Sequence, residues 1–308
     1  MPLTRRLKSL RPKAKPKVSI EMNKPAGDTG GFVRFRLDLA YDGTDFVGWA
    51  KQPGHRTVAG ELIKTFEKIF GETSDDFAMR VAGRTDAGVH AKHQVCHLDI
   101  PEDRIVRIGR DPLNAKRLNT LLPEDVIAHE FSPISADFDA RFSALGRHYR
   151  YTIADTQNKK DPRLVRYVLE YKRALDVALL NEAAEVLIGL HDFAAFCKPR
   201  KGASTIRNLK DFHAVRQPDG LITIEIHADA FCHNMVRALV GSIVAVADSR
   251  ITVKDLVQVL KTGSRGNRFR VVSAKGLSLE SVDYPNPKEY AKQADVTKIM
   301  RKIGDISV

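Results

Sequence analysis

Alternating apolar and polar residues mark the first regular element of the chain. Over residues 33–39, valine, phenylalanine and leucine alternate with arginine and aspartate, which is the period of a half-buried β-strand. Thr57 is typical of an N-cap, and apolar residues then recur at helical spacing over 58–70 until a glycine ends the run. Further strands are predicted around 77–81 and 96–100, so the residues between them form a loop of the same sheet.

The second half of the chain mixes the same two periods. The pattern predicts, in order, a strand at 148–154, a helix at 176–190, two strands around the Pro218-Asp219-Gly220 turn, a helix at 231–248 and a capped helix from Thr252 to Gly263. Because strands and helices do not alternate strictly, we expect an α+β fold with mainly antiparallel strands rather than a doubly wound parallel sheet. The polar residues after Tyr284 predict either disorder or a peripheral helix.

Positive charge is concentrated at the N-terminus. The 308-residue chain has 50 Lys and Arg against 38 Asp and Glu, a net charge of +12. Residues 1–30 hold eight of the basic and two of the acidic residues, which is half of that net charge, with four prolines among them. This composition predicts a disordered basic arm over residues 1–31. Positive fields favour polyanionic partners, so the arm is either a nucleic-acid-binding element or a solvated tail.

Several classes of protein are disfavoured by what the sequence lacks. No apolar run approaches the roughly 18 residues that cross a bilayer, and no apolar stretch follows the basic N-terminus as in a secretory signal. The three cysteines, Cys96, Cys197 and Cys232, fit neither a disulfide framework nor a metal-ligand spacing. We therefore predict reduced core thiols in a cytoplasmic protein.

The strongest candidate for chemistry is the loop VAGRTDAGVHA at residues 81–91. Gly83 and Gly88 flank Asp86, and glycines permit unusual backbone angles and the close approach of another molecule. The acid is therefore predicted to be presented to a ligand, on a loop held by rigid strands. The alternative from local features alone is a salt bridge between Asp86 and Arg84.

Other kinds of site find less support. Nucleotide-binding and zinc-protease motifs are absent, glycoside hydrolysis needs a second facing carboxylate, and neither a nucleophile elbow nor a nuclease-type metal cluster is evident. A metal at His90, His93 and His97 is not expected, since the sequence shows no convergent partner. Tyr149 and Tyr151 alternate with cations, as in surfaces that stack bases, although cross-strand aromatic pairing explains that spacing better.

GRTDAGVHA resembles the catalytic motif of the TruA family of tRNA pseudouridine synthases. Five further blocks are similar to blocks of that family and stand in its order: YDGTDFVGWAKQP at 41–53, FDARFSALGRHYRYTI at 138–153, GLHDFAAFCKP at 189–199, FCHNMVRALVGSIVAV at 231–246 and AKGLSLESVDYP at 274–285. The resemblance covers residues 34–285, and the two tails fall outside it.

The resemblance implies the pseudouridine synthase fold, in which two similar α+β halves with mainly antiparallel sheets join around a central basic cleft. The N-terminal half, with the catalytic aspartate, is then expected at 32–137, the C-terminal half at 138–285 and a tail of unassigned role at 286–308. The resemblance further implies a cytoplasmic homodimer that needs no cofactor, metal or membrane. Its substrate is the anticodon stem-loop of tRNA, at uridines 38, 39 and 40, where the N1–C1′ bond breaks and the uracil rejoins through C5.

The resemblance also assigns residues to roles. Asp86 matches the catalytic nucleophile, and the sequence leaves open whether it attacks C1′ or C6 or acts on the 2′ side. Arg237 matches its arginine partner, so an Asp86–Arg237 ion pair is expected, and Tyr149 is expected to stack on the uracil and help to move the C5 proton. The remaining substrate contacts are expected from Arg84, Arg141 and Leu277. The alternative is a catalytically silent RNA-binding protein on the same scaffold, which the presence of all three catalytic residues disfavours.

Overall fold

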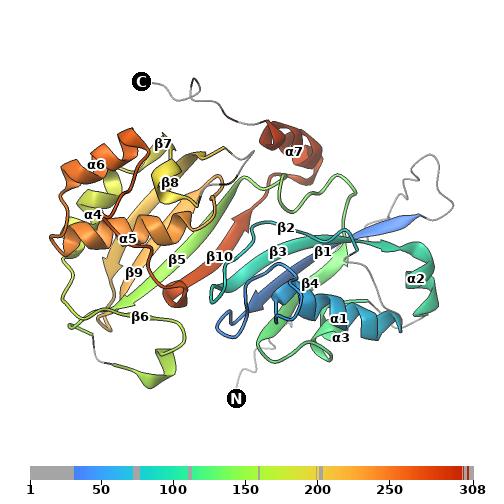
Figure 1. Ribbon diagram of the computed structural model, residues 1–308. Coiled ribbons are helices and arrows are strands. Elements are labelled where there is room, and N and C mark those ends of the chain that lie inside the picture. Colours follow the sequence, from blue (N-terminus) through green and yellow to red (C-terminus); the bar gives the residue numbers. More distant parts are fainter. Residues whose placement is uncertain are drawn as a thin grey trace, which may run out of the picture.

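The computed structural model describes residues 31–71, 77–109, 113–158, 160–198, 200, 204–299, 301 and 304 (Figure 1). The basic arm predicted from the sequence therefore lies outside the described residues, apart from its last residue. In the described part of the chain, no helix has both the length and the apolar character that a membrane crossing requires.

A single ten-stranded sheet runs through the molecule, with the strand order β4-β1-β3-β10-β5-β9-β8-β7, while β2 pairs with β3 and β6 with β5. All pairings are antiparallel except β3 with β10 and β5 with β6. The strands are β1 Phe32–Tyr41, β2 Arg80–Val81, β3 His90–Pro101, β4 Val126–Pro133, β5 Gly146–Ala154, β6 Leu169–Glu170, β7 Gly189–Asp192, β8 Ile206–Arg216, β9 Ile222–Ala228 and β10 Leu277–Asp283. The mixed, mainly antiparallel arrangement confirms the predicted α+β class.

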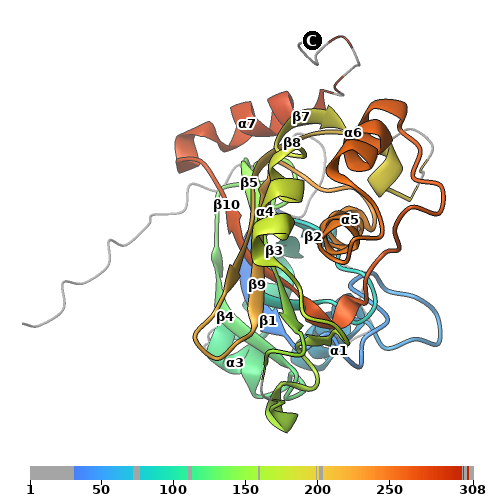
Figure 2. The ribbon, with the colours of Figure 1, turned by 90° about the vertical axis from the view of Figure 1, so that its left-hand side faces the viewer.

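Helices pack against this sheet. They are α1 Val58–Phe70, α2 Glu102–Arg107, α3 Ala115–Asn119, α4 Val177–Glu185, α5 Met235–Ala247, α6 Val253–Thr262 and α7 Tyr290–Lys298, with short 3₁₀ turns η1 Pro162–Leu164, η2 Ala194–Phe196, η3 Ala274–Gly276 and η4 Pro287–Glu289. Figure 2 shows α1, α5 and α6 on the same side of the strands. Along β5 and β9 buried and partly exposed residues alternate, as expected for a sheet with one covered and one open face.

Strand β10 joins the two parts of the sheet. It comes from the end of the chain, yet it lies between β3 of the first half and β5 of the second (Figure 1). Its Leu279 pairs with Ala91 on one side and with Tyr149 on the other. The strand that follows the candidate loop and the strand that carries the candidate tyrosine are thereby fixed at a set spacing.

The local predictions for the first half of the chain are confirmed with one exception. Thr57 accepts a hydrogen bond from the Gly60 N–H at the start of α1, and Gly71 ends the helix with a φ of 72°, the left-handed conformation that glycine adopts without strain. The strand predicted at 77–81 was too long, because Phe77 adopts a φ of 48° and only Arg80–Val81 pairs with β3.

Two predicted helices of the second half were too long. The helix predicted at 176–190 ends at residue 185, and Gly189, with a φ of 117°, begins β7. The helix predicted at 231–248 begins only after Asn234, whose φ of 67° is not helical. The third helix matches its prediction, because Thr252 forms a capping box with Asp255, which satisfies two free N–H groups at once. The polar tail contains the peripheral helix α7, whose Tyr290 packs on Phe138.

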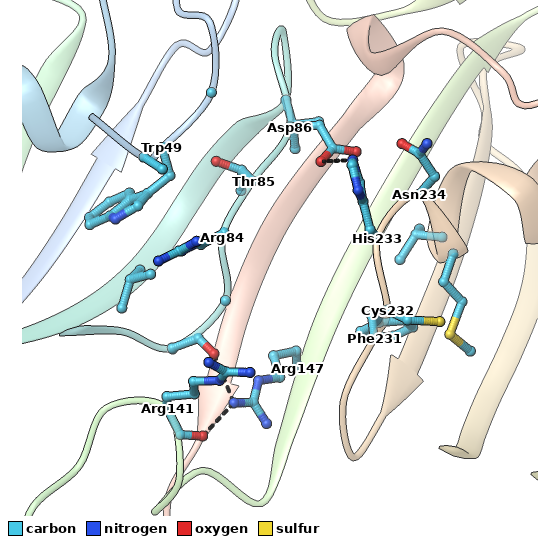
Figure 3. Close-up of a pocket in the computed structure, with 18 of the residues that line it drawn as sticks. Trp49, Arg84, Thr85, Asp86, Arg141, Arg147, Phe231, Cys232, His233 and Asn234 are labelled. Carbon is cyan, nitrogen blue, oxygen red and sulfur yellow. Dashed lines mark hydrogen bonds and ion pairs between the residues drawn. The ribbon is translucent and has the colours of Figure 1, made fainter. Parts of the chain in front are cut away.

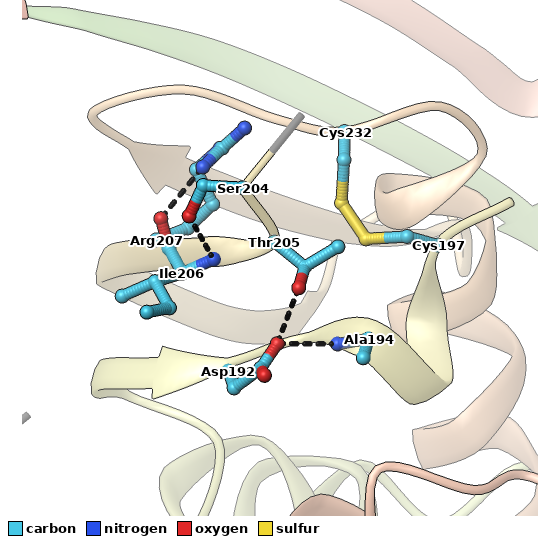
Figure 4. The surroundings of a disulfide bond; sticks show 8 residues. All are labelled: Asp192, Ala194, Cys197, Ser204, Thr205, Ile206, Arg207 and Cys232. Atoms are coloured by element: carbon cyan, nitrogen blue, oxygen red, sulfur yellow. Dashed lines mark hydrogen bonds between the residues drawn. A yellow bond between two sulfur atoms is a disulfide. The ribbon is translucent and has the colours of Figure 1, made fainter. Parts of the chain in front are cut away.

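The prediction of three reduced thiols was wrong for two of them. Cys197, just after η2, and Cys232, just before α5, are joined by a disulfide, with their Cα atoms 5.7 Å apart (Figure 4). Cys96 is a buried free thiol, and burial raises its pKa. The pair was missed because the two cysteines are 35 residues apart, and their convergence depends on how β7–β9 fold back toward α5.

Candidate active site

The loop between β2 and β3 presents Asp86, and the loop between β1 and α1 holds it in place. The Trp49 N–H donates to the Thr85 carbonyl, and the Gly88 N–H donates to the Phe46 carbonyl. Gly48 has a φ of 89°, and a Cβ there would lie 2.8 Å from the Thr85 carbonyl oxygen. The segment at 41–53 therefore serves as a cradle for the Asp86 loop, and its glycine allows the two backbones to approach closely.

A buried polar network fixes the same loop from the side of the sheet. The Tyr41 hydroxyl lies 2.8 Å from the Thr85 Oγ1, and the Gln94 side-chain amide donates to the Gly83 carbonyl at 2.8 Å and to the Tyr41 hydroxyl at 3.2 Å. Burial raises the pKa of Tyr41 to about 12, so this phenol stays neutral and keeps its hydrogen bonds. Buried networks of this kind rigidify a site when every member has a partner.

Arg147 connects three segments behind the cleft. Its guanidinium donates to the main-chain carbonyls of Ala82, Arg141 and Asp229, at 2.8, 2.7 and 2.7 Å. The residue is only 5% exposed, and burial lowers the pKa of its guanidinium. Arg147 thus ties the Asp86 loop, the loop before β5 and the loop before α5 to one another (Figure 3).

The Asp86 carboxylate faces a guanidinium and an imidazole, and Arg84 does not contact it. Oδ2 lies 3.7 Å from the Arg237 Nη1, and Oδ1 lies 3.3 Å from the His233 Nε2. Figure 3 shows Arg84 and Asp86 pointing in different directions from their loop. The expected Asp86–Arg237 ion pair is confirmed, and the simple Arg84 salt bridge has no support. The side chain of Asp86 remains 27% exposed, so a ligand in the cleft can reach it.

Helix α5 explains why Arg237 points into the cleft. Every residue of this helix is buried except Arg237, which is the single charged side chain on an apolar helix. Its Nε donates to the Val272 carbonyl at 2.8 Å, leaving Nη1 directed toward Asp86. A guanidinium anchored at one nitrogen keeps a fixed direction at the others.

Tyr149 and Leu277 form an apolar wall beside the carboxylate. Both residues are buried and both line the cleft. Burial raises the pKa of the Tyr149 phenol far above its usual value, so the ring presents a neutral surface. Phe231 packs edge-on against it, with ring centroids 5.2 Å apart. Spacing alone favoured an ordinary cross-strand role for Tyr149, but the structure places it in the cleft with Asp86.

The cleft itself has a volume of about 1300 Å³ and a strongly basic lining. Among the described residues that line it, Asp86 is the one carboxylate. Seven arginines and one lysine accompany it: Lys51, Arg80, Arg84, Arg141, Arg147, Arg200, Arg207 and Arg237. Burial, together with the charges of Arg84 and Arg200, lowers the pKa of Arg141. This crowding of cations is sustained most easily when a polyanion occupies the cleft.

Sequence reasoning missed several residues of the site, among them Arg147, Arg200, Arg207 and His233. His233 stands in the FCHNMVRALVGSIVAV block, but helical spacing does not relate it to Arg237, because α5 begins only after Asn234. For Arg147 the sequence offered only its place in the FDARFSALGRHYRYTI block. No signal marked Arg200 or Arg207, because their nearness to Asp86 depends on strand pairing.

The histidines considered as metal ligands have other roles. The Gly43 N–H donates to the His90 Nδ1, His93 lies 2.8 Å from Asp38, and the Ala140 N–H donates to the His97 Nδ1. His90 and His97 thus hold loops in place and His93 contacts Asp38, so the three rings do not converge on one point. Within the described part of the chain, no third metal ligand joins Asp86 and His233 in the cleft.

Comparison with known proteins adds a family to this geometry. Residues 183–285 match the sequence profile of a family described as tRNA pseudouridine synthase. The chain is 46% identical over 256 residues to tRNA pseudouridine synthase A of Streptomyces avermitilis, which covers 83% of this chain and 89% of that protein. It is 44% identical over 278 residues to the protein of the same name from Mycobacterium leprae, covering 87% and 96%.

Among solved structures, a crystal structure of the archaeal box H/ACA sRNP Nop10-Cbf5 complex aligns at 11% identity over 83% of this chain and 61% of that chain. Its TM-score of 0.29 is too low to support a conclusion. The sequence relatives are sufficient to assign the family, because their alignments with this chain include both parts of the sheet. The chain belongs to the tRNA pseudouridine synthase A family.

Proposed function

We propose that this protein isomerises uridine to pseudouridine at positions 38, 39 and 40 in the anticodon stem-loop of tRNA, and that it acts as a homodimer in the cytoplasm. The observation that carries the proposal is the single carboxylate, Asp86, in a cleft lined by eight Arg and Lys side chains. The cations match a phosphate backbone, whose counterions are released on binding. The family relationship identifies the nucleic acid as tRNA.

The proposed reaction makes specific demands on the cleft. The N1–C1′ bond breaks, a C5–C1′ bond forms, and the hydrogen on C5 leaves while N1 gains a proton. Electrons and atoms balance within the uridine apart from this exchange of protons. The reaction therefore needs an ionised carboxylate at the sugar or base, a surface that holds the detached uracil and a route for the C5 proton.

In this proposal, each requirement of the reaction is met by a residue of the cleft. Asp86 is the nucleophile, and the Arg237 guanidinium, 3.7 Å from its carboxylate, stabilises the charge that changes during the reaction. Tyr149 stacks on the uracil and Leu277 closes the pocket. Extruding the base from the helix costs a few kcal/mol, and Arg84 and Arg141, on the cleft lining, offset that cost by binding phosphates or filling the vacated space.

Release of the C5 hydrogen gives a direct assay. With tRNA transcript that carries tritium at C5 of its uridines, the wild-type chain is expected to release label until the uridines at 38, 39 and 40 are used up. Transcripts with cytidine at those three positions are the matched control and should release none. A chain that binds tRNA but releases no tritium would instead be a silent RNA-binding protein.

Replacing Arg237 by Gln is expected to slow tritium release about 10-fold to 100-fold, because the carboxylate loses its nearest guanidinium. Binding of tRNA should change little, since seven other cations remain in the cleft. Arg268→Gln, on an exposed residue away from the cleft, serves as the control. Equal rates for the two variants would show that Arg237 has no part in the reaction.

Deleting residues 1–30 is expected to weaken tRNA binding and reduce its dependence on salt. The slope of log K against log salt falls by about 0.7 to 0.9 for each phosphate that the protein no longer neutralises, and the segment holds eight cations. Filter binding between about 50 and 200 mM salt measures the slope. A slope identical to that of the full chain would mean that the arm does not bind tRNA.

A further inference from the structure

Two histidines and an aspartate meet on the open face of the sheet, away from the cleft. His148 of β5 and His227 of β9 are directly opposite in the strand register, and their rings stack with centroids 3.7 Å apart. Asp283 of β10 joins them from the other side of β5 (Figure 1). Its Oδ2 lies 2.7 Å from the His148 Nε2 and 3.3 Å from the His227 Nε2.

The hydrogen bonding of this cluster is incomplete. His148 and Asp283 form one hydrogen bond, but the buried Nε2 of His227 has no hydrogen-bond partner. A buried nitrogen without a partner costs free energy. The three ligand atoms nevertheless all lie within 4.8 Å of one another. The cluster therefore brings together three atoms that can bind one positively charged centre, and one of them is left unused.

Gly146 keeps room for this arrangement. A Cβ at that position would lie 2.4 Å from the His227 Nε2 and 3.1 Å from the Asp283 Oδ2. Strand β5 thus needs a glycine at position 146, where the His227 imidazole passes close to its backbone. Gly146 does not have a positive φ, so its role here is the space it leaves and not its backbone conformation.

We propose that His148, His227 and Asp283 form a binding site for a divalent transition-metal ion of the Zn²⁺ class. Two imidazole nitrogens and one carboxylate oxygen are a common ligand set for zinc, and imidazole suits first-row metals in general. A tetrahedral ion with bonds of about 2.0 to 2.2 Å holds its ligand atoms about 3.3 Å apart. The 3.3 Å between the Asp283 Oδ2 and the His227 Nε2 matches that spacing, and the 2.7 Å hydrogen bond between Asp283 and His148 would lengthen when the ion binds.

The surroundings suit a hydrated cation that enters from solvent. The side chains of His148 and Asp283 are 36% and 41% exposed, so water can complete the coordination. Lys210 and Asp211 of β8 place opposite charges near His227, and Asp211 is paired with His227 in the strand register.

Sequence spacing could not reveal this site, because its three ligands are contributed by strands far apart in the chain. The metal site is separate from the catalytic cleft, which lies on the covered face of the sheet. A bound metal would fasten β9, β5 and β10 together directly behind Tyr149, the neighbour of His148. Its expected effect is on the stability of the strands that frame the cleft rather than on the chemical step.

Cobalt titration tests the proposal without depending on activity. The full chain, without an affinity tag and stripped by a chelator, is titrated with Co²⁺, and the visible ligand-field bands are recorded. We expect one equivalent to bind, Zn²⁺ to displace it, and Zn²⁺ to raise the melting temperature. His227→Gln and Asp283→Asn are each expected to weaken binding about 10-fold or more, and Gly146→Ala should do the same by displacing the imidazole.

His213→Gln is the matched control, since His213 also lies beside an aspartate on the neighbouring strand β8 but, among the described residues, has no third ligand. It should bind Co²⁺ like the wild type. Circular dichroism checks that each variant folds, and His148→Gln replaces any that does not. The proposal is overturned if the wild type binds no stoichiometric metal at concentrations on the order of 100 µM, or if the ligand variants bind as well as the control.

Discussion

Asp86→Asn is expected to reduce tritium release from C5-labelled tRNA by about 10³-fold or more. The substitution removes the proposed nucleophile, and the other catalytic residues cannot replace it. Asparagine keeps the size of the side chain and its hydrogen-bonding capacity toward His233, so the loop should keep its conformation. Affinity for tRNA should remain within about threefold, since binding rests on the cations of the cleft. The variant therefore separates chemistry from binding.

A matched control is available in Asp125. Its side chain is 22% exposed and forms an ion pair with Arg56, so it resembles Asp86 in burial and partner but lies outside the cleft lining. Asp125→Asn should release tritium at close to the wild-type rate. An Asp86→Asn variant that remained as active as Asp125→Asn would mean that the chemistry has been assigned to the wrong residue.

Arg147→Met is expected to lower the free energy of unfolding by about 2 to 4 kcal/mol. The substitution removes the donor from three carbonyl oxygens, the buried one of Ala82 and the part-buried ones of Arg141 and Asp229, and an unsatisfied buried group costs about 1 to 3 kcal/mol. Removing a charge whose burial is itself unfavourable returns part of that cost. Urea unfolding followed by circular dichroism measures the difference.

Arg150→Met provides the comparison on the same strand. Arg150 is partly exposed on the open face and pairs with Glu225 and Glu280, and exposed pairs of this kind contribute about 1 kcal/mol or less. Arg147→Met should therefore be clearly the less stable of the two. If both variants unfold at the same urea concentration, the connection of the three loops through Arg147 has little energetic weight.

Structural features that are determined by neighbouring residues could be predicted from the sequence. The N-cap Thr57, the terminal Gly71 and the alternation in β1 depend on residues within a few positions of each other, and all three predictions were confirmed. Errors occurred where a single backbone angle decided the outcome. At Asn234 a positive φ delayed a helix, and at Gly189 a residue with a positive φ begins a strand where the apolar pattern predicted helix.

Contacts between distant segments could not be predicted by periodicity. The Asp86–Arg237 pair was expected only because the motifs resemble those of a family, and the structure then confirmed the contact. The Cys197–Cys232 disulfide and the His148, His227 and Asp283 cluster had no such guide. The disulfide depends on how β7–β9 fold back toward α5, and the cluster depends on β10 pairing with β5 beside β9, which no local pattern indicates.

Mapping pseudouridine in a modified transcript tests the proposed reaction and its position together. An unmodified tRNA with uridines throughout the anticodon arm is incubated with the wild-type chain, treated with carbodiimide and read by primer extension. We expect new stops that correspond to positions 38, 39 and 40 and to no other uridine of that arm. A transcript that is bound but shows no stop, or shows stops only elsewhere, would contradict the proposed function.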